Sequence, residues 1–178
     1  MIKKMVQWEE RRISSLKLIK RKMIGDAMKI ATKYSGEVEI NPKNIITFPQ
    51  GIPSFEEEKE FVLLPFSEPP SSPFYILQSV HTEGLAFVVM TPFVFYHEYE
   101  VKIPDNVVEQ IEIEKEEDVA LFTIITFRET LEKSTVNLRG PIVINSAKQL
   151  GKQIVLNDSN YETRHPLKVP TASTGQEG

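Results

Sequence analysis

Three histidines and 25 carboxylates are the side chains of this 178-residue chain that could act as acids, bases or metal ligands. His81, His97 and His165 lie far apart, and none belongs to the H-x-x-H or H-E-x-x-H patterns that bind zinc. The chain has no cysteine, so it offers no thiol nucleophile, no thiolate metal ligand and no disulfide. The sequence therefore predicts neither a metal site nor a bound cofactor.

Motifs that position a nucleophile or a phosphate are also missing from the sequence. It contains no G-x-S-x-G elbow, no Walker loop and no G-x-G-x-x-G turn. The carboxylates of Glu56, Glu57 and Glu58 fit the solvated face of a short helix better than a catalytic pair. We therefore expect a binding protein and not an enzyme, with a small hydrolase-like barrel enzyme as the alternative.

The densest negative segment of the chain is "EIEKEED", residues 112–118. As a turn between two strands, it would protect the sheet against edge-to-edge pairing. It would also attract a basic partner, because clustered charge of one sign raises the local concentration of the opposite charge. The candidate partner-binding residues of this segment are Glu112, Glu114, Glu116, Glu117 and Asp118.

A second candidate surface is the aromatic segment "PFVFYHEY", residues 92–99. On a strand, Phe93 and Phe95 would point to one face and Tyr96 to the other, because successive side chains alternate. One face would then belong to the core and the other would be partly exposed. Phe93, Phe95 and Tyr96 are the candidate residues of an aromatic binding patch.

Short runs rich in Val, Ile, Phe and Thr alternate with Pro, Gly, Asn and acidic turns, which is typical of an antiparallel all-β barrel or sandwich. Ser35-Gly36 reads as a hairpin turn. Short connecting helices are expected after Ser54, where Glu57 completes a capping box, and within 103–110. The expected strands are 28–34, 37–40, 44–48, 60–64, 74–80, 85–90, 92–99, 99–103, 110–114, 119–127, 135–138, 141–145 and 152–156.

The two ends of the chain differ in composition from its middle. Residues 1–27 hold 8 Lys or Arg and 3 Asp or Glu, and the other residues hold 13 and 22, a net charge of −9. Apolar residues at helical spacing within 1–27 predict a basic amphipathic helix. This segment is either an extension of the domain or a stretch that precedes its ordinary start at Met28. We expect one domain over 28–167 and a flexible tail over 168–178.

The acidic body argues against two classes of partner. It repels phosphate backbones, so direct nucleic-acid binding is not expected, and an RNA or membrane-surface binder would have to act through the basic N-terminal arm. No apolar run approaches the roughly 18 residues that span a bilayer. The N-terminus also lacks the continuous apolar core of a secretory signal. We therefore expect a cytoplasmic protein without membrane association.

Several short segments follow one another in a set order, ending with "YETRHPL" (161–167). The others are "FPQGIPSFEE" (48–57), "FYILQS" (74–79), "NLRGPIVIN" (137–145) and Gln153 within "KQIVL". Together they resemble the FliW family of flagellar assembly factors over about residues 28–167. The resemblance implies a small cytoplasmic β-barrel-like protein. It also implies partners, namely flagellin and CsrA, an RNA-binding repressor of flagellin translation that such a protein binds and antagonises.

The sequence departs from this family at one position of the first motif. Ser54 stands where the family commonly has a second glycine, so the turn there either differs or tolerates serine. In the later motif, Gly140-Pro141 interrupts an otherwise strand-like run. Proline lacks an N–H and fixes its φ, so the run is predicted to be two strand segments joined by a kink, with Arg139 pointing outward as a candidate contact residue.

Overall fold

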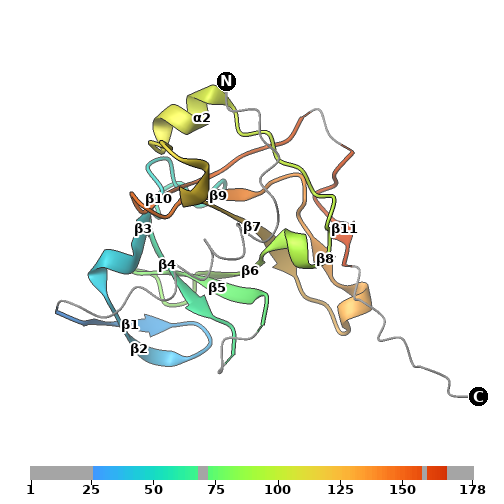
Figure 1. Ribbon diagram of the computed structural model, residues 1–178. Helices are drawn as coiled ribbons and strands as arrows, with labels where there is room; N and C mark the ends of the chain where they lie inside the picture. Colours follow the sequence, from blue (N-terminus) through green and yellow to red (C-terminus); the bar gives the residue numbers. More distant parts are fainter. Residues whose placement is uncertain (1–25, 68–71, 158–159, 168–178) are drawn as a thin grey trace, which may run out of the picture.

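The computed structural model describes residues 26–67, 72–157 and 160–167 (Figure 1). The basic helix expected before residue 26 and the tail expected over 168–178 lie outside these described residues. Strands dominate the described part of the chain, as the composition predicted. None of the helices in this part is long and apolar enough to cross a membrane.

Seven strands close into a barrel-like sheet, which decides between the barrel and the sandwich. Consecutive strands from β3 to β7 pair antiparallel, and β9 then pairs with both β7 and β10. The ring closes through β10 and β3, which run parallel, unlike the other pairs of the ring. The seven strands are β3 (Ile45–Thr47), β4 (Glu60–Pro65), β5 (Phe74–Ser79), β6 (Ala86–Met90), β7 (Val119–Thr126), β9 (Ile142–Asn145) and β10 (Leu150–Gln153).

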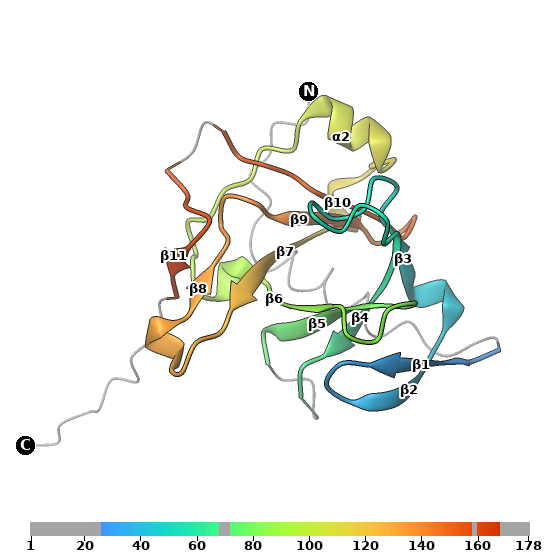
Figure 2. The same cartoon turned by 180° about the vertical axis from the view of Figure 1, so that it is seen from behind.

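Smaller elements decorate the barrel. Strands β8 (Thr135–Val136) and β11 (His165–Pro166) extend the sheet beyond β7, and β1 (Met28–Thr32) pairs with β2 (Gly36–Ile40) in a separate hairpin. Helix α2 (Asp105–Gln110) and this hairpin lie at opposite ends of the molecule (Figures 1 and 2). Single 3-10 turns connect the strands at η1 (Pro42–Asn44), η2 (Pro92–Val94), η3 (Glu116–Asp118) and η4 (Leu131–Lys133).

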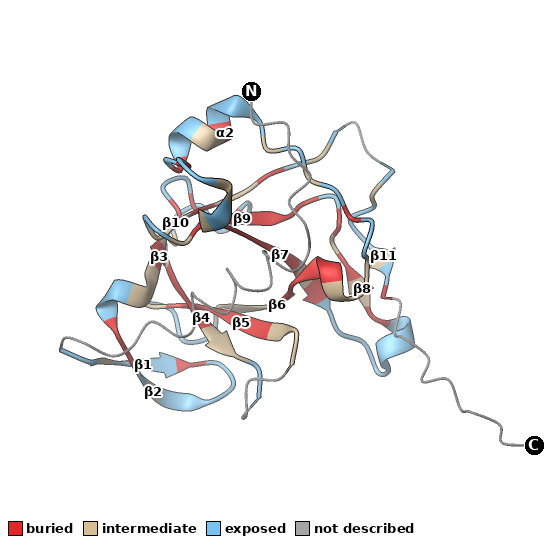
Figure 3. Ribbon diagram, in the orientation of Figure 1, coloured by how far each residue is buried: buried red, intermediate tan, exposed pale blue. Residues whose placement is uncertain are grey.

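Strand β7 runs between two apolar cores, which explains its near-continuous apolar sequence. Leu121 and Ile125 belong to an outer core under α2 and the following loops, whereas Ala120 and Phe122 point into the barrel. This division follows from the period-two alternation of side chains along a strand. Figure 3 shows β7 and β9 as buried segments, with exposed α2 on one side and the mostly exposed hairpin on the other.

Most strands predicted from the sequence are confirmed, with shifted ends. The hairpin turn at Ser35-Gly36 is present, and Gly36 adopts a φ of 64° that glycine reaches without strain. The strand predicted over 152–156 instead covers Leu150–Gln153, and the one predicted over 135–138 ends at Val136.

Besides 92–99, which is described with the site below, two predicted strands, 99–103 and 110–114, are wrong. The first is an extended loop, and the second follows the helix that was correctly predicted within 103–110. There the backbone N–H of Ile113 bonds to the Val108 carbonyl, and Glu112 takes a φ of 53° that reverses the chain. The alternating isoleucines of this segment therefore pack beneath a helix end and do not join a sheet.

The capping-box helix predicted after Ser54 is also wrong, because this segment forms tight turns. Ser54 has a φ of 71°, in the left-handed region that favours glycine, and its N–H bonds to the Glu56 carboxylate. A serine therefore holds a backbone conformation that glycine would reach without strain. Gly51, with a φ of 69°, lies so close to Glu56 that a Cβ would stand 2.6 Å from its backbone.

The Gly140-Pro141 interruption is a kink between two segments that pair with the same strand, as predicted. Val136 in β8 pairs with Ile125, and Ile142 in β9 pairs with Phe122. The five residues 137–141 of the kink therefore lie opposite only two residues of β7, Thr123 and Ile124. Asn137 closes the kink by accepting a hydrogen bond from the Gly140 N–H at 2.8 Å.

Candidate functional site

The histidines of the described residues do not form a metal site, and no three His, Cys, Asp or Glu side chains there group closely enough to hold an ion. The ring of His81 pairs with Glu60, with 2.7 Å between Nε2 and Oε2. The ring of His165 packs edge-on against Tyr96, and His97 is exposed.

Glu58, which precedes β4, accepts hydrogen bonds from two hydroxyl groups in the β5–β6 turn. Ser79 Oγ donates to its Oε2 at 2.8 Å, and Thr82 Oγ1 donates to its Oε1. Ser79 Oγ also accepts from the backbone N–H groups of His81 and Thr82. The hydroxyl groups, that of Thr82 foremost, lower the pKa of Glu58 below its ordinary value of 4.5. The network ties the loop before β4 to this turn, so Ser79 has a structural role.

We expect Glu58→Gln to lower the stability at neutral pH by about 1 kcal/mol or less, because the carboxylate is partly exposed. A folded-state pKa below the unfolded value of 4.5 means that the stabilisation is present above about pH 4.5. It is lost as the pH falls through the lower, folded-state pKa. Thermal unfolding of both proteins at about pH 7 and pH 3 measures this. A difference in Tm that persists undiminished at the lower pH would contradict the assignment.

The aromatic segment 92–99 is not a strand, contrary to the prediction. It opens with η2, and the backbone N–H groups of Phe95 and Tyr96 both bond to the Pro92 carbonyl. Phe93 is only 5% exposed and belongs to the outer core, so it does not face a partner. The Tyr96 hydroxyl donates to a backbone carbonyl of β11 at 2.6 Å. Tyr96 therefore holds β11 in place, and Phe95 is the member of the predicted patch that joins an exposed aromatic group.

That group is a cluster of four phenylalanines drawn from four separate segments. The Phe74 ring lies 5.8 Å from Phe95, 6.0 Å from Phe127 and 6.1 Å from Phe66, between ring centroids. Phe66 and Phe127 also lie 6.1 Å apart. Phe66 is 45% exposed and Phe127 is 37% exposed, although aromatic rings usually bury most of their surface. We call Phe66, Phe74, Phe95 and Phe127 the phenylalanine cluster.

The acidic segment 112–118 connects α2 to β7 and ends in η3. Lys148 stands 3.3 Å from Glu114 and 3.9 Å from Glu112, so it partly neutralises the first half of the segment. Glu116 and Asp118 are half-buried and Glu117 is exposed. The residues predicted at this site do lie together, although the segment follows a helix and not a strand.

The acidic segment is held by a buried amide from the "NLRGPIVIN" motif. Asn145, which is 1% exposed, donates from Nδ2 to the carbonyls of Ile111 and Glu112 at 2.9 and 2.8 Å. Its Oδ1 accepts from the N–H groups of Ala147 and Lys148. The motif therefore fixes the start of the acidic segment against the end of β9.

Arg139 points outward from the kink, as predicted, and its side chain is exposed. Its backbone is fixed on both sides: the N–H bonds to the Glu162 carbonyl at 3.3 Å, and its carbonyl accepts from Leu156 at 2.8 Å. A contact between the Arg139 side chain and a partner stays a prediction.

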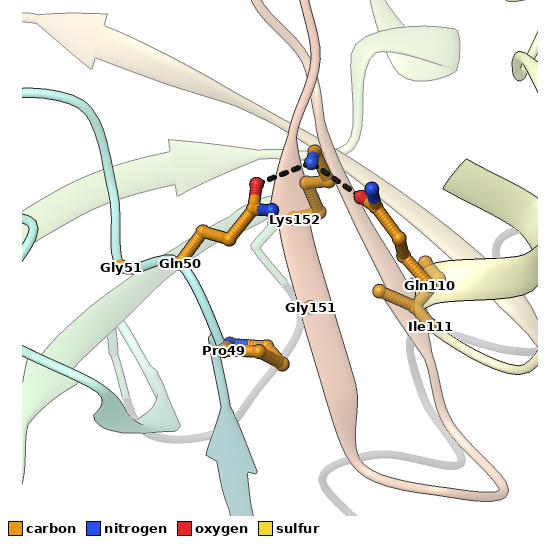
Figure 4. Close-up of a pocket in the computed structure, with 7 residues that line it drawn as sticks. All are labelled: Pro49, Gln50, Gly51, Gln110, Ile111, Gly151 and Lys152. Atoms are coloured by element: carbon orange, nitrogen blue, oxygen red, sulfur yellow. Dashed lines mark hydrogen bonds between the residues drawn. The ribbon is translucent and has the colours of Figure 1, made fainter. Parts of the chain in front are cut away.

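A small notch that the sequence did not reveal lies between α2, the loop after β3 and strand β10 (Figure 4). Its cavity measures about 80 Å³. Lys152 is one of the lining residues, and it donates to the side-chain oxygens of Gln50 and Gln110, each at 2.5 Å. The remaining lining residues are Pro49, Gly51, Ile111 and Gly151.

Two surfaces of opposite chemistry thus stand at the two ends of β7. Asp118 directly precedes the strand and Phe127 directly follows it. The strand of 8 residues places them nine residues apart, which is about 30 Å at about 3.3 Å per residue. One end of the barrel is acidic and the other is aromatic.

Comparisons with known proteins agree with this architecture. The model of the family described as "FliW protein" matches residues 29–167. The flagellar assembly factor FliW of Geobacillus kaustophilus is 51% identical over 140 residues, which cover 79% of this chain and 95% of that protein. The flagellar assembly factor FliW of Bacillus subtilis is 48% identical over 140 residues, which cover 79% of this chain and 96% of that protein.

A solved structure has the same fold as this chain. A crystal structure of the flagellar assembly factor FliW superimposes with a TM-score of 0.75 at 49% sequence identity. The match covers 81% of this chain and 99% of the other. The family model, the relatives and the solved structure agree over the same barrel, and the chain therefore belongs to the FliW family of flagellar assembly factors.

Proposed function

We propose that this protein acts in the cytoplasm as a non-enzymatic binder of flagellin and of CsrA, and that it antagonises the repression of flagellin translation by CsrA. Membership of the FliW family supports a role in flagellar assembly. The observation that carries the proposal is the pair of exposed surfaces at the two ends of β7, the phenylalanine cluster and the acidic segment.

The phenylalanine cluster is the surface that suits flagellin. An export substrate with adhesive terminal helices needs an apolar surface on its binder, and amphipathic helices dock on such surfaces through side chains at helical spacing. Phe66 and Phe127 expose their rings beside the half-buried Phe74 and Phe95, where an incoming helix would cover them. Aromatic side chains of this kind dominate the energetics of many interfaces.

The acidic segment is the surface that suits CsrA. A protein that represses translation by binding RNA must present Lys or Arg to phosphates. Carboxylates at Glu116 and Glu117, on a body that carries a net charge of −9, attract such a basic surface. CsrA bound there could no longer bind RNA, either because its RNA-binding groove is covered or because its conformation is changed.

The double substitution Glu116→Lys and Glu117→Lys is expected to slow CsrA association several-fold and to flatten its dependence on salt. Exposed charges act mainly on the association rate, over a screening length of about 8 Å at physiological ionic strength. Stopped-flow mixing across a series of salt concentrations measures both quantities. Flagellin binding should be unchanged.

A matched control makes the same change in net charge elsewhere. Glu37 and Glu39 are exposed on β2, in the hairpin at the other end of the molecule from α2. Glu37→Lys with Glu39→Lys should slow CsrA association much less. Equal effects of the two pairs would show that total charge matters and that the acidic segment is not the contact.

The proposed function is tested by size-exclusion chromatography of the purified protein with purified flagellin and, separately, with purified CsrA. Co-elution with each partner is the expected result. Failure to co-elute with either of them, at concentrations of about 10 μM, would contradict the proposal for that partner.

A further inference from the structure

The Lys152 notch contains a positive charge that pairs with no carboxylate of the described residues. Lys152 is half-buried, and no carboxylate among the described residues forms an ion pair with it, although the body of the protein is rich in Asp and Glu. Its two hydrogen-bond partners, Gln50 and Gln110, are neutral. An ammonium whose partners are neutral gains from a charge-assisted hydrogen bond to a carboxylate supplied by another molecule.

The glutamines leave the notch rich in hydrogen-bond donors. Each uses its side-chain oxygen to accept from the ammonium, because lysine donates and never accepts. The orientation of both amides is thereby fixed, and both –NH₂ groups remain as donors. The ammonium has three N–H groups, of which the glutamines take two. This set of donors matches the oxygens of a carboxylate.

The shape of the notch suits an acidic side chain or a chain terminus. Its cavity of about 80 Å³ has room for a carboxylate with one or two methylene groups. Pro49 and Ile111 supply apolar walls for those methylenes and lie on either side of strand β10 in Figure 4.

Packing holds the walls of the notch in place. Asn145 fixes the carbonyl of Ile111, and a Cβ on Gly151 would stand 2.6 Å from the Phe48 ring, so β10 is pressed onto the barrel core. A site held in this way loses little conformational entropy when a ligand binds.

The notch adjoins the acidic segment, because Gln110 precedes Glu112 by two residues on the same helix end. When a basic partner binds that segment, the acidic group of the partner that lies nearest to the notch would reach Lys152. A cation beside five carboxylates gives the surface a charge pattern, and such patterns fix the orientation of a partner.

We propose that the Lys152 notch binds a carboxylate of CsrA and so sets the orientation of CsrA on the acidic segment. This inference rests on the proposed binding of CsrA and adds to it a specific contact of opposite sign. The carboxylate comes from an Asp or Glu side chain of CsrA or from the end of its chain.

The test replaces Lys152 by methionine, which keeps the length and apolar stem of the side chain and removes its charge. We expect Lys152→Met to raise the Kd for CsrA about five- to tenfold, mainly through faster dissociation. Lys152→Arg should restore part of the affinity. Lys148→Met is the matched control, because it removes a nearby positive charge that already pairs with Glu112 and Glu114, and it should not weaken binding.

The source of the carboxylate is found with variants of CsrA. Each Asp and Glu of CsrA is neutralised in turn, and its C-terminus is amidated in a separate sample. The CsrA variant that lacks the bound carboxylate should bind the natural protein more weakly than unaltered CsrA does. It should bind Lys152→Met with the same affinity as unaltered CsrA.

Unchanged CsrA affinity in folded Lys152→Met, with slowed association in the Glu116 and Glu117 reversal, would overturn the notch proposal and leave the proposed function standing. Absence of CsrA binding by the natural chain would overturn both. A thermal unfolding curve for Lys152→Met establishes that the variant is folded.

Discussion

Replacing Phe66 and Phe127 together by serine is expected to weaken flagellin binding about 30-fold, while the barrel remains folded. The two rings are 45% and 37% exposed and lie 6.1 Å apart, so a docking helix would cover both. Loss of about 1 kcal/mol for each interface aromatic gives about 2 kcal/mol, and 1.4 kcal/mol corresponds to tenfold. The half-buried Phe74 and Phe95, which pack against the outer core, remain to support the fold.

Isothermal titration of purified flagellin into the natural and doubly substituted proteins measures this effect. Tyr34→Ser is the matched control, because Tyr34 is 55% exposed on the turn between β1 and β2 and lies outside the phenylalanine cluster. The control should bind flagellin as the natural protein does. Equal affinity of the double variant and the natural protein would remove the cluster from the flagellin interface. CsrA affinity, which we propose to depend on the other end of β7, should be the same in all three proteins.

Replacing Asn145 by alanine is expected to lower the free energy of unfolding by about 3 kcal/mol. Its side chain makes four hydrogen bonds to backbone groups, and the Ile111 carbonyl would lose a partner in a buried place. Each net hydrogen bond is worth about 1 kcal/mol, and an unsatisfied buried acceptor costs about 1–3 kcal/mol. For a domain of this size, the loss corresponds to a decrease in Tm of about 6–12 °C.

Asn137→Ala is the control for this prediction, since Asn137 is half-buried and its side chain bonds to the Gly140 N–H at 2.8 Å. Its expected loss is about 1 kcal/mol. Chemical denaturation of both variants compares them. A smaller loss for Asn145→Ala than for Asn137→Ala would contradict the role given to Asn145. The Asn145 variant should also bind CsrA more weakly, because the acidic segment loses its anchor.

The strands of the barrel were predictable because the type of each side chain, apolar or polar, reflects whether the face of the sheet on which it lies is buried. β7 is apolar along nearly all of its length since both of its faces are buried. The hairpin between β1 and β2 was predictable because Ser35-Gly36 is a residue pair that favours a tight turn. The kink at Gly140-Pro141 was predictable for the same local reason. The closing pair β3–β10 was not, because a parallel contact between segments about a hundred residues apart leaves no local pattern.

The wrong secondary-structure predictions fall in segments where the spacing of apolar residues reflects packing against distant parts of the chain and not a local strand or helix. Ile111 and Ile113 alternate like strand residues, yet both pack into the outer core from the end of a helix. In 92–99, proline at the first position of η2 favours a helical turn over a strand. Ser54 satisfies the capping-box spacing, but its positive φ directs the chain into a turn.

The candidate surfaces differ in how far the sequence shows them. The acidic segment is contiguous, so its charges are visible in the sequence. The phenylalanine cluster gathers Phe66, Phe74, Phe95 and Phe127 from four segments, and only folding brings them together. The notch likewise joins Lys152 to two glutamines, the farther of which is 102 residues away. Long-range contacts of this kind have no signature in residue spacing.

Fluorescence anisotropy shows whether this protein binds CsrA at the expense of RNA. A labelled RNA carrying the translation start of the flagellin message is first saturated with CsrA, and the purified protein is then added. We expect the anisotropy to decrease to the value of free RNA as the protein is added. More of the Glu116→Lys and Glu117→Lys variant should be needed for the same decrease. If the anisotropy stays constant or rises at a large excess of the natural protein, the protein does not release CsrA from RNA and the proposed function is wrong.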